Sequence, residues 1–127
     1  SVITPKPAAL LDRYLRYALG VSSELQRGRL WLAVELLHRM RTLLMELYAV
    51  THGYERAVQS FEVYAAPGLH KRLAALLPQG EAESVRVCLH NGLMLVEERL
   101  ADFGYAHIKL TEAQVALLKQ LRRCCIE

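Results

Sequence analysis

The sequence predicts an all-α protein, an antiparallel bundle of four to five helices. Apolar residues recur at helical spacing along most of the chain, glycines and prolines separate these periodic segments, and strand signals are nearly absent. With 127 residues, the chain is long enough for one hydrophobic core and too short for two. We therefore expect a single helical-bundle domain over residues 8–127, preceded by an arm or linker at residues 1–7.

Composition and charge narrow the class of protein. The chain is 53% hydrophobic and 23% charged, which favours a compact domain over a disordered one. Its net charge is +3 and its basic residues form no dense run, so nucleic acid is not the expected partner. No apolar run approaches the roughly 18 residues that span a bilayer, so no membrane partner is expected. The odd count of three cysteines favours a reducing cytoplasm.

The first helix is predicted to begin near Ala8, where leucines and tyrosines start to recur at helical spacing. We expect Gly20 to kink or end this helix. Ser22 or Ser23 would then cap a further turn, and Gly28 would break it.

The central helix of the bundle is predicted between Gly28 and Gly53, because this segment is apolar around well more than half of its circumference. Gly53 suits the position that closes a helix, and Trp31 near the start is expected in the core or at an interface. One narrow polar stripe follows the helix and consists of Glu35, His38, Arg39, Thr42 and Glu46. The stripe is either a solvated face held by i, i+4 pairs, or the wall of a cleft for a cationic or hydroxyl-rich substrate.

Arg41 projects from the apolar side of the same helix. A charge inside apolar surface requires a partner or a ligand. One interpretation is a structural arginine paired with Glu62, Glu97 or Glu98. The other is an arginine that faces a ligand, in a pocket beside Tyr48.

Two short helices and one long helix follow. Residues 55–65 and Leu69–Leu77 have helical periodicity, and the segments Pro67-Gly68 and 78–80 interrupt it. A long helix is predicted over residues 81–103, with Gly92 allowing the close approach of a neighbour.

The last helix is predicted from a capping box. Gly104 ends the long helix before it, and Thr111 stands three residues before Gln114. This spacing lets the two side chains bond each other's backbone N–H groups and open a helix that extends to about Cys125.

Familiar catalytic and metal-binding patterns are missing from the sequence. The histidines are scattered without ligand spacing, and there is no G-x-S-x-G, P-loop or G-x-G-x-x-G. We therefore assign no metal ligand and no catalytic residue. Arg86-x3-His90 falls one residue short of the R-x4-6-H motif of the helical ribonuclease bundles known as HEPN domains, so that match fails.

One segment resembles a known family. Residues 26–41 read QRGRLWLAVELLHRMR and are followed by His52-Gly53 and Glu55-Arg56-Ala57. This pattern resembles the C-terminal, substrate-binding helical bundle of small nucleotidyltransferases of the kanamycin and lincosamide nucleotidyltransferase kind. It also resembles the related two-protein pairs in which the bundle is a separate chain.

The resemblance implies that an α/β domain elsewhere carries Gly-Ser and Asp-x-Asp motifs, which hold magnesium and a nucleoside triphosphate. This sequence has neither motif, so we expect a substrate-binding accessory domain that does not transfer nucleotides alone. Because the chain begins at Ser1, we expect the catalytic domain in the same gene or a neighbouring one. From their place on the central helix, the candidate substrate-binding residues are Glu35, His38, Arg39, Arg41, Glu46 and Tyr48.

The alternative is a free-standing interaction module that dimerises through the central helix, in the manner of a toxin–antitoxin-like or HEPN-like bundle. We also expect a homo-oligomer, and only the interaction module requires its contact to form through the central helix.

Overall fold

The computed structural model describes residues 6–104 and 108–126. Over these residues the chain is all-α, which confirms the predicted bundle. The elements are α1 (Pro7–Gln26), α2 (Leu30–His52), α3 (Ala57–Tyr64), α4 (Pro67–Ala74), α5 (Ala82–Glu98), the 3-10 helix η1 (Leu100–Phe103) and α6 (Glu112–Ile126). Of the predicted arm, residues 1–5 lie outside the described residues, and Pro7 already begins α1.

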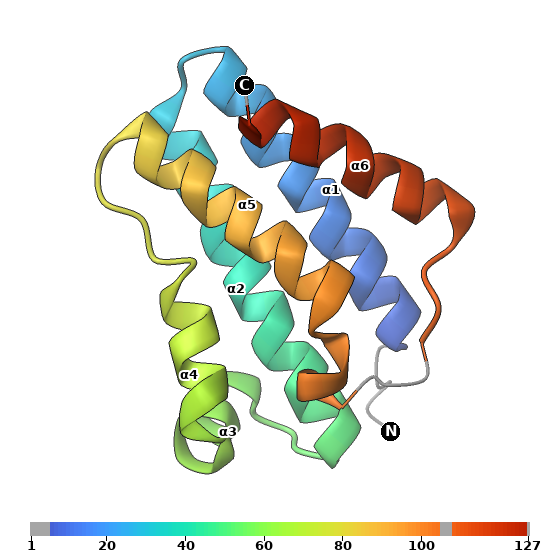
Figure 1. Cartoon of the computed structure of the whole chain (residues 1–127). Coiled ribbons are helices and arrows are strands. Elements are labelled where there is room, and N and C mark those ends of the chain that lie inside the picture. Colours follow the sequence, from blue (N-terminus) through green and yellow to red (C-terminus); the bar gives the residue numbers. More distant parts are fainter. Residues whose placement is uncertain (1–5, 105–107, 127) are drawn as a thin grey trace.

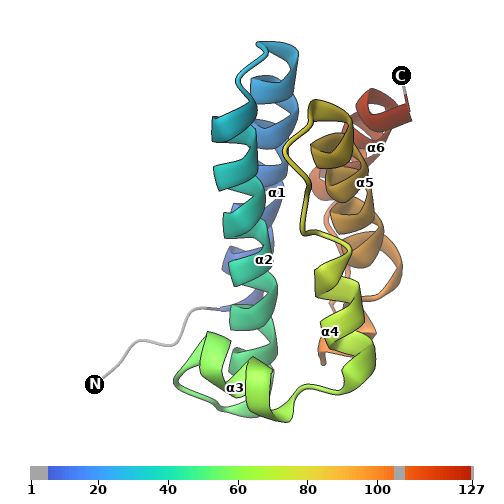
Figure 2. The same ribbon diagram turned by 90° about the vertical axis from the view of Figure 1, so that its left-hand side faces the viewer.

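The helices form two layers. Helices α1 and α2 lie side by side and antiparallel, and α5 and α6 lie across them in a second layer (Figure 1). The short helix α3 packs on the C-terminal part of α2, and α4 leads from α3 back toward the start of α5 (Figure 2). None of the helices in the described part of the chain has the length and apolar character needed to cross a bilayer.

Two glycines bound α2 as predicted. Gly28 has φ 72° and Gly53 has φ 73°, in the left-handed region that favours glycine. Three residues, Arg27 to Arg29, separate α1 from α2. So short a connection places the two helices next to each other in antiparallel order.

The predicted break at Gly20 is wrong, because α1 continues without interruption to Gln26. A Cβ added at Gly20 would lie 2.9 Å from Cδ1 of Leu36 on α2. The glycine therefore serves close helix packing rather than a turn. Ser22 and Ser23 lie within α1 instead of capping a separate turn.

The long helix predicted over residues 81–103 is two elements. Helix α5 ends at Glu98, and a 3-10 turn covers Leu100–Phe103 before Gly104, whose φ is 92°. The sequence predicts the helical character and the glycine stop but misses the change of helix type at Arg99.

The core is closely packed where α1, α2 and α5 meet. The fully buried Tyr14 hydroxyl donates a 2.6 Å hydrogen bond to the Gly92 carbonyl oxygen. A Cβ added at Gly92 would lie 2.9 Å from that hydroxyl oxygen and 3.1 Å from Cε of Met40. The predicted role of Gly92 in close approach is confirmed.

The predicted capping box opens α6. The Thr111 backbone N–H donates to Gln114 Oε1 at 2.9 Å, and the Gln114 backbone N–H donates to Thr111 Oγ1 at 3.1 Å. The Gln114 side-chain nitrogen also donates to Asp12 Oδ1 at 2.7 Å, which attaches the start of α6 to α1.

Candidate functional site

The polar stripe of α2 lines a groove that it shares with α1. We call this hollow of about 300 Å³ the α1–α2 groove. Its lining residues are Arg13, Tyr17, Glu35, His38, Arg39, Thr42, Leu43 and Glu46. The five stripe residues of the prediction are therefore gathered in one hollow, together with two side chains of α1.

Helix geometry explains how these residues meet. The stripe residues are three or four positions apart on α2, so they lie on one face. Arg13 and Tyr17 are four positions apart on α1 and lie on one face in the same way. Because α1 and α2 are antiparallel neighbours, the two faces form opposite walls of one groove.

Opposite charges alternate along the groove. Arg39 Nε lies 3.4 Å from Glu35 Oε1, which confirms the predicted i, i+4 pair. The Arg39 guanidinium also lies 5.8 Å from the centre of the Tyr17 ring. Hydrogen bonding to Arg39, with Arg13 nearby, lowers the pKa of Tyr17. Two arginines thus face two glutamates, and the groove is close to neutral.

The other predicted stripe pair, Thr42 with Glu46, does not form a hydrogen bond. The Thr42 hydroxyl donates back to the His38 carbonyl oxygen at 3.2 Å. Glu46 forms no ion pair among the described residues and lines the α1–α2 groove with its carboxylate unneutralised. A cationic or hydroxyl-bearing ligand could take the place of that missing partner.

Arg41 lies outside the α1–α2 groove, toward α4. Its Nη1 donates to the Leu76 carbonyl oxygen at 2.7 Å, and its Nη2 lies 3.0 Å from His38 Nδ1. Since a guanidinium only donates, His38 Nδ1 is the acceptor. Burial lowers the pKa of Arg41. The side chain caps the turn after α4, where carbonyl groups at the end of a helix attract a cation.

The expected pairing of Arg41 with an acidic residue is not formed. Glu97 pairs with Arg122 Nη1 at 2.9 Å, and Glu62 lies 3.9 Å from His70 Nδ1. No ion pair joins Arg41 to any described residue. Arg41 also lines a small, mainly apolar hollow between α2, α3 and α4, so the structural contact does not bury it completely.

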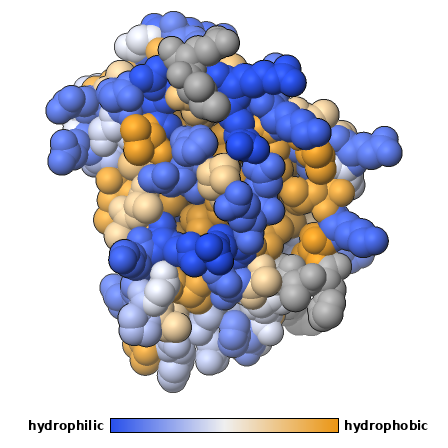
Figure 3. Space-filling view, in the orientation of Figure 1, coloured by the Kyte–Doolittle hydropathy of each residue, from blue (hydrophilic) through white to orange (hydrophobic). Residues whose placement is uncertain are grey.

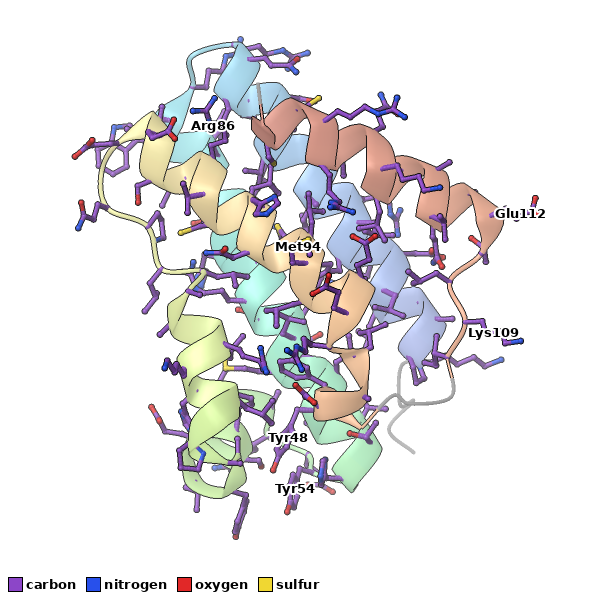
Figure 4. The ribbon with its side chains drawn as sticks, viewed as in Figure 1. Tyr48, Tyr54, Arg86, Met94, Lys109 and Glu112 are labelled. Carbon is purple, nitrogen blue, oxygen red and sulfur yellow. The ribbon has the colours of Figure 1, made fainter. Side chains whose placement is uncertain are left out.

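Tyr48 is separate from both hollows. It is 5% exposed, and its ring stacks on His52 with a centroid distance of 4.2 Å and meets Phe61 edge-on at 5.3 Å. Tyr48 and Tyr54 lie at the end of the bundle that holds α3 (Figure 4). The candidate Tyr48 therefore stabilises the attachment of α3 and is not placed with the other candidates.

The thiols of Cys88 and Cys125 are held in their neutral form. Burial raises the pKa of Cys88, and burial with the adjacent Cys124 raises the pKa of Cys125 to about 11. A neutral, part-buried thiol is a poor nucleophile and a poor metal ligand. No group of three histidine, cysteine, aspartate or glutamate residues in the described ranges is arranged to hold a metal ion.

Comparison with known protein families, with characterised proteins and with solved structures finds no match to this chain. The case for a function therefore rests on the residues of the chain itself.

Reasoning from the sequence missed the α1 wall of the groove. The sequence pattern places Arg13 and Tyr17 in the first helix and predicts no role for them. Their four-residue spacing was visible, but only the antiparallel pairing of α1 with α2 brings them opposite Glu35 and Arg39. The short connection at residues 27–29 is the signal that predicts this pairing.

Proposed function

We propose that this chain is the substrate-binding helical domain of a nucleotidyltransferase, and that the α1–α2 groove holds a small acceptor that carries hydroxyl groups. One observation carries the proposal: the stripe residues of α2 share one polar hollow with Arg13 and Tyr17. The resemblance of residues 27–57 to the bundles of small nucleotidyltransferases supports the same assignment.

The groove has the chemistry that such an acceptor needs. Carboxylates at Glu35 and Glu46 bind ammonium or hydroxyl groups, and His38, Thr42 and Tyr17 offer further hydrogen bonds. The residues lie on two long, packed helices, which hold a bound acceptor in a fixed orientation. The chain would contribute binding and orientation.

The transfer itself requires a catalytic domain that this sequence does not contain. That domain would supply Gly-Ser and Asp-x-Asp motifs, magnesium and the nucleoside triphosphate. An acceptor hydroxyl would attack the α-phosphorus, its proton would pass to a base, and pyrophosphate would leave. The same gene or a neighbouring gene is expected to encode the domain. If neither does, the proposal fails.

A binding experiment tests the groove directly. We would titrate the isotope-labelled chain with kanamycin, a hydroxyl-rich cation, and follow the backbone amide signals by NMR. The expected result is saturable movement of signals from Arg13, Tyr17 and residues 35–46. Movement only in α5 and α6, or no movement at millimolar kanamycin, would contradict the assignment.

A second candidate function is a dimeric interaction module, and one observation favours it. Trp31 is 79% exposed and Leu32 is 49% exposed at the start of α2. Neighbouring exposed apolar side chains of this size are typical of protein interfaces. The expectation that Trp31 lies in the core is wrong, and the expectation of an interface stays a prediction.

Light scattering separates the two candidates. A dimeric module predicts a dimer at micromolar concentration that Trp31→Ser converts to monomer. Val63→Ser is the matched control, because Val63 is 72% exposed on α3, away from the start of α2. A monomeric wild-type chain would leave the substrate-binding domain as the better account.

A further inference from the structure

A second groove lies on another face of the bundle, between α4 and α5. This α4–α5 groove has a volume of about 530 Å³, compared with about 300 Å³ for the α1–α2 groove. Its lining residues are Gly68, Lys71, Arg72, Ala75, Asn91, Met94, Leu95, Glu98 and Arg99. Met94 lies in the C-terminal half of α5 on the face shown in Figure 4.

The two ends of the groove differ in character. It extends from Asn91 on α5 to Arg99, the residue that follows the helix, which is about 12 Å at the rise of an α-helix. The end near Arg99 carries the charged side chains, and the other end is formed by Asn91, Met94 and Ala75. Figure 3 shows strongly hydrophilic residues near the middle of this face beside hydrophobic ones.

Positive charge is in excess at the polar end. Three cations line it, Lys71, Arg72 and Arg99, against one lining carboxylate, Glu98. Arg72 is neutralised by Asp102, whose Oδ2 lies 3.1 Å from Arg72 Nε. Lys71 and Arg99 form no ion pair within the described ranges, so their charges face the groove unneutralised.

The start of α4 strengthens the attraction for an anion. Gly68 is the second residue of α4, and no side chain caps the start of this helix. A Cβ added at Gly68 would meet nothing within 4 Å, so the groove is open at this point. Pro67 has no N–H, and the N–H groups of Leu69 and His70 donate to the Ala66 carbonyl oxygen, so Gly68 supplies the N–H available at this helix start. The partial positive charge of the helix start lies here beside Lys71 and Arg72.

The walls of the groove are fixed before any ligand arrives. Asn91 Nδ2 donates to the Ala75 carbonyl oxygen at 2.9 Å and joins α5 to the end of α4. The Arg72–Asp102 pair joins α4 to η1 at the other end. Arg41 holds the turn after α4 through Leu76. A groove with fixed walls loses little entropy when it binds a ligand.

We propose that the α4–α5 groove binds an organic phosphate, with the phosphoryl group between Lys71, Arg99 and the start of α4, and an apolar or flat body over Met94 and Ala75. The concave shape and the apolar end favour a small molecule. An acidic protein surface would contact only the exposed cations and would not need the hollow or its apolar end. This site is separate from the acceptor groove and does not depend on the function proposed for it.

Methionine methyl signals give a direct test. The chain has three methionines: Met94 lines this groove, Met45 lines the hollow beside Arg41, and Met40 is fully buried. We would titrate the methyl-labelled chain with ADP, with adenosine and with inorganic pyrophosphate at physiological ionic strength. ADP is expected to move the Met94 signal saturably and to leave those of Met40 and Met45 in place.

The matched variants remove equal charge. The double variant Lys71→Gln with Arg99→Gln is expected to weaken ADP binding by about tenfold. This factor corresponds to the loss of roughly 1.4 kcal/mol from charge-assisted hydrogen bonds to the phosphate groups. Lys109→Gln with Arg123→Gln removes the same charge from exposed positions elsewhere and is expected to change the affinity by less than about twofold.

Each outcome decides the proposal. Weaker binding of adenosine than of ADP supports a phosphate site, and weaker binding of pyrophosphate than of ADP supports the apolar end. Equal loss in both double variants would mean general attraction to a basic protein and would overturn the proposal. So would an unmoved Met94 signal at millimolar ADP. Binding of an acidic peptide but not of ADP would reassign the groove to a protein partner.

Discussion

The α1–α2 groove and the α4–α5 groove are both hollows between two helices, but they differ in how their charges are balanced. In the first, two arginines face two glutamates, and Arg39 is engaged by both Glu35 and Tyr17. In the second, Lys71 and Arg99 have no carboxylate partner in the described part of the chain. A balanced groove suits a hydroxyl-rich acceptor, whereas an excess of cations suits a phosphate.

The grooves also share a structural support, which is the packing of α1, α2 and α5 around Gly92. Gly92→Ala is expected to lower the free energy of unfolding by about 2 kcal/mol, because the new Cβ would collide with the Tyr14 hydroxyl and with Met40. Urea denaturation measures the change. Because both grooves depend on this packing, both are expected to bind their ligands more weakly in this variant.

The control for that substitution is Gly68→Ala. The space around Gly68 is open, and alanine is the better helix former, so the free energy of unfolding is expected to rise by up to about 1 kcal/mol. Equal destabilisation by both substitutions would show that the close contact at Gly92 is not what limits stability.

Tyr14→Phe tests the same contact by removing one hydroxyl. The free energy of unfolding is expected to fall by about 1.5 kcal/mol at neutral pH, because the buried Gly92 carbonyl oxygen loses the hydrogen bond that the Tyr14 hydroxyl donates. Burial raises the pKa of Tyr14 in the folded state above the ordinary value of about 10. The stability that the Tyr14 hydroxyl contributes is therefore fully present below about pH 10, and it is lost as the pH rises from there toward the raised pKa of the folded state. The difference between wild type and variant should narrow in urea titrations above that pH.

Arg41→Met is expected to affect the surroundings of the α4–α5 groove and to leave those of the α1–α2 groove unchanged. The variant would lose the hydrogen bond to the Leu76 carbonyl oxygen, but a methionine side chain costs less to bury than a guanidinium. The free energy of unfolding is therefore expected to fall by about 1 kcal/mol. Hydrogen exchange is expected to accelerate in α4 and in the turn at residues 75–77 while α1 stays protected. Equal acceleration in α1 would contradict a local capping role.

The smallest effect on stability is expected from Arg39→Gln in the α1–α2 groove. Its ion pair with Glu35 is exposed, so the urea midpoint should stay within experimental error. The pKa of Tyr17 should rise, because hydrogen bonding to Arg39 is the main cause of its lowering. Titration of the Tyr17 ring signals by NMR measures that rise. An unchanged pKa would show that Arg39 does not reach the phenol.

The sequence predicts the bundle well because glycines and the helical period act locally. The left-handed glycines at positions 28 and 53 and the capping box at Thr111 depend on a few neighbouring residues. The prediction at Gly20 is wrong because a glycine that allows close packing and a glycine that ends a helix look alike in sequence. Only the position of Leu36 on the opposite helix separates the two cases.

The sites were less predictable than the helices. Residues of one stripe are related by helix geometry alone, so Glu35 to Glu46 could be grouped in advance. Lys71 and Arg99 are far apart in sequence, and they line one groove because the chain passes through two short helices, α3 and α4, before α5. The helical pattern marks Arg41 as an unusual charge, but its partner is a backbone carbonyl oxygen, which no side-chain pattern reveals.

The most direct test of the central proposal is the affinity of the α1–α2 groove for a cationic, hydroxyl-rich acceptor. Calorimetry would compare kanamycin binding to the wild-type chain, to Glu35→Gln with Glu46→Gln, and to Glu55→Gln with Glu112→Gln as a control at exposed sites outside that groove. We predict about tenfold weaker binding for the groove variant and a change within about twofold for the control. Equal affinity of the three proteins would contradict the assignment of this groove as the acceptor site.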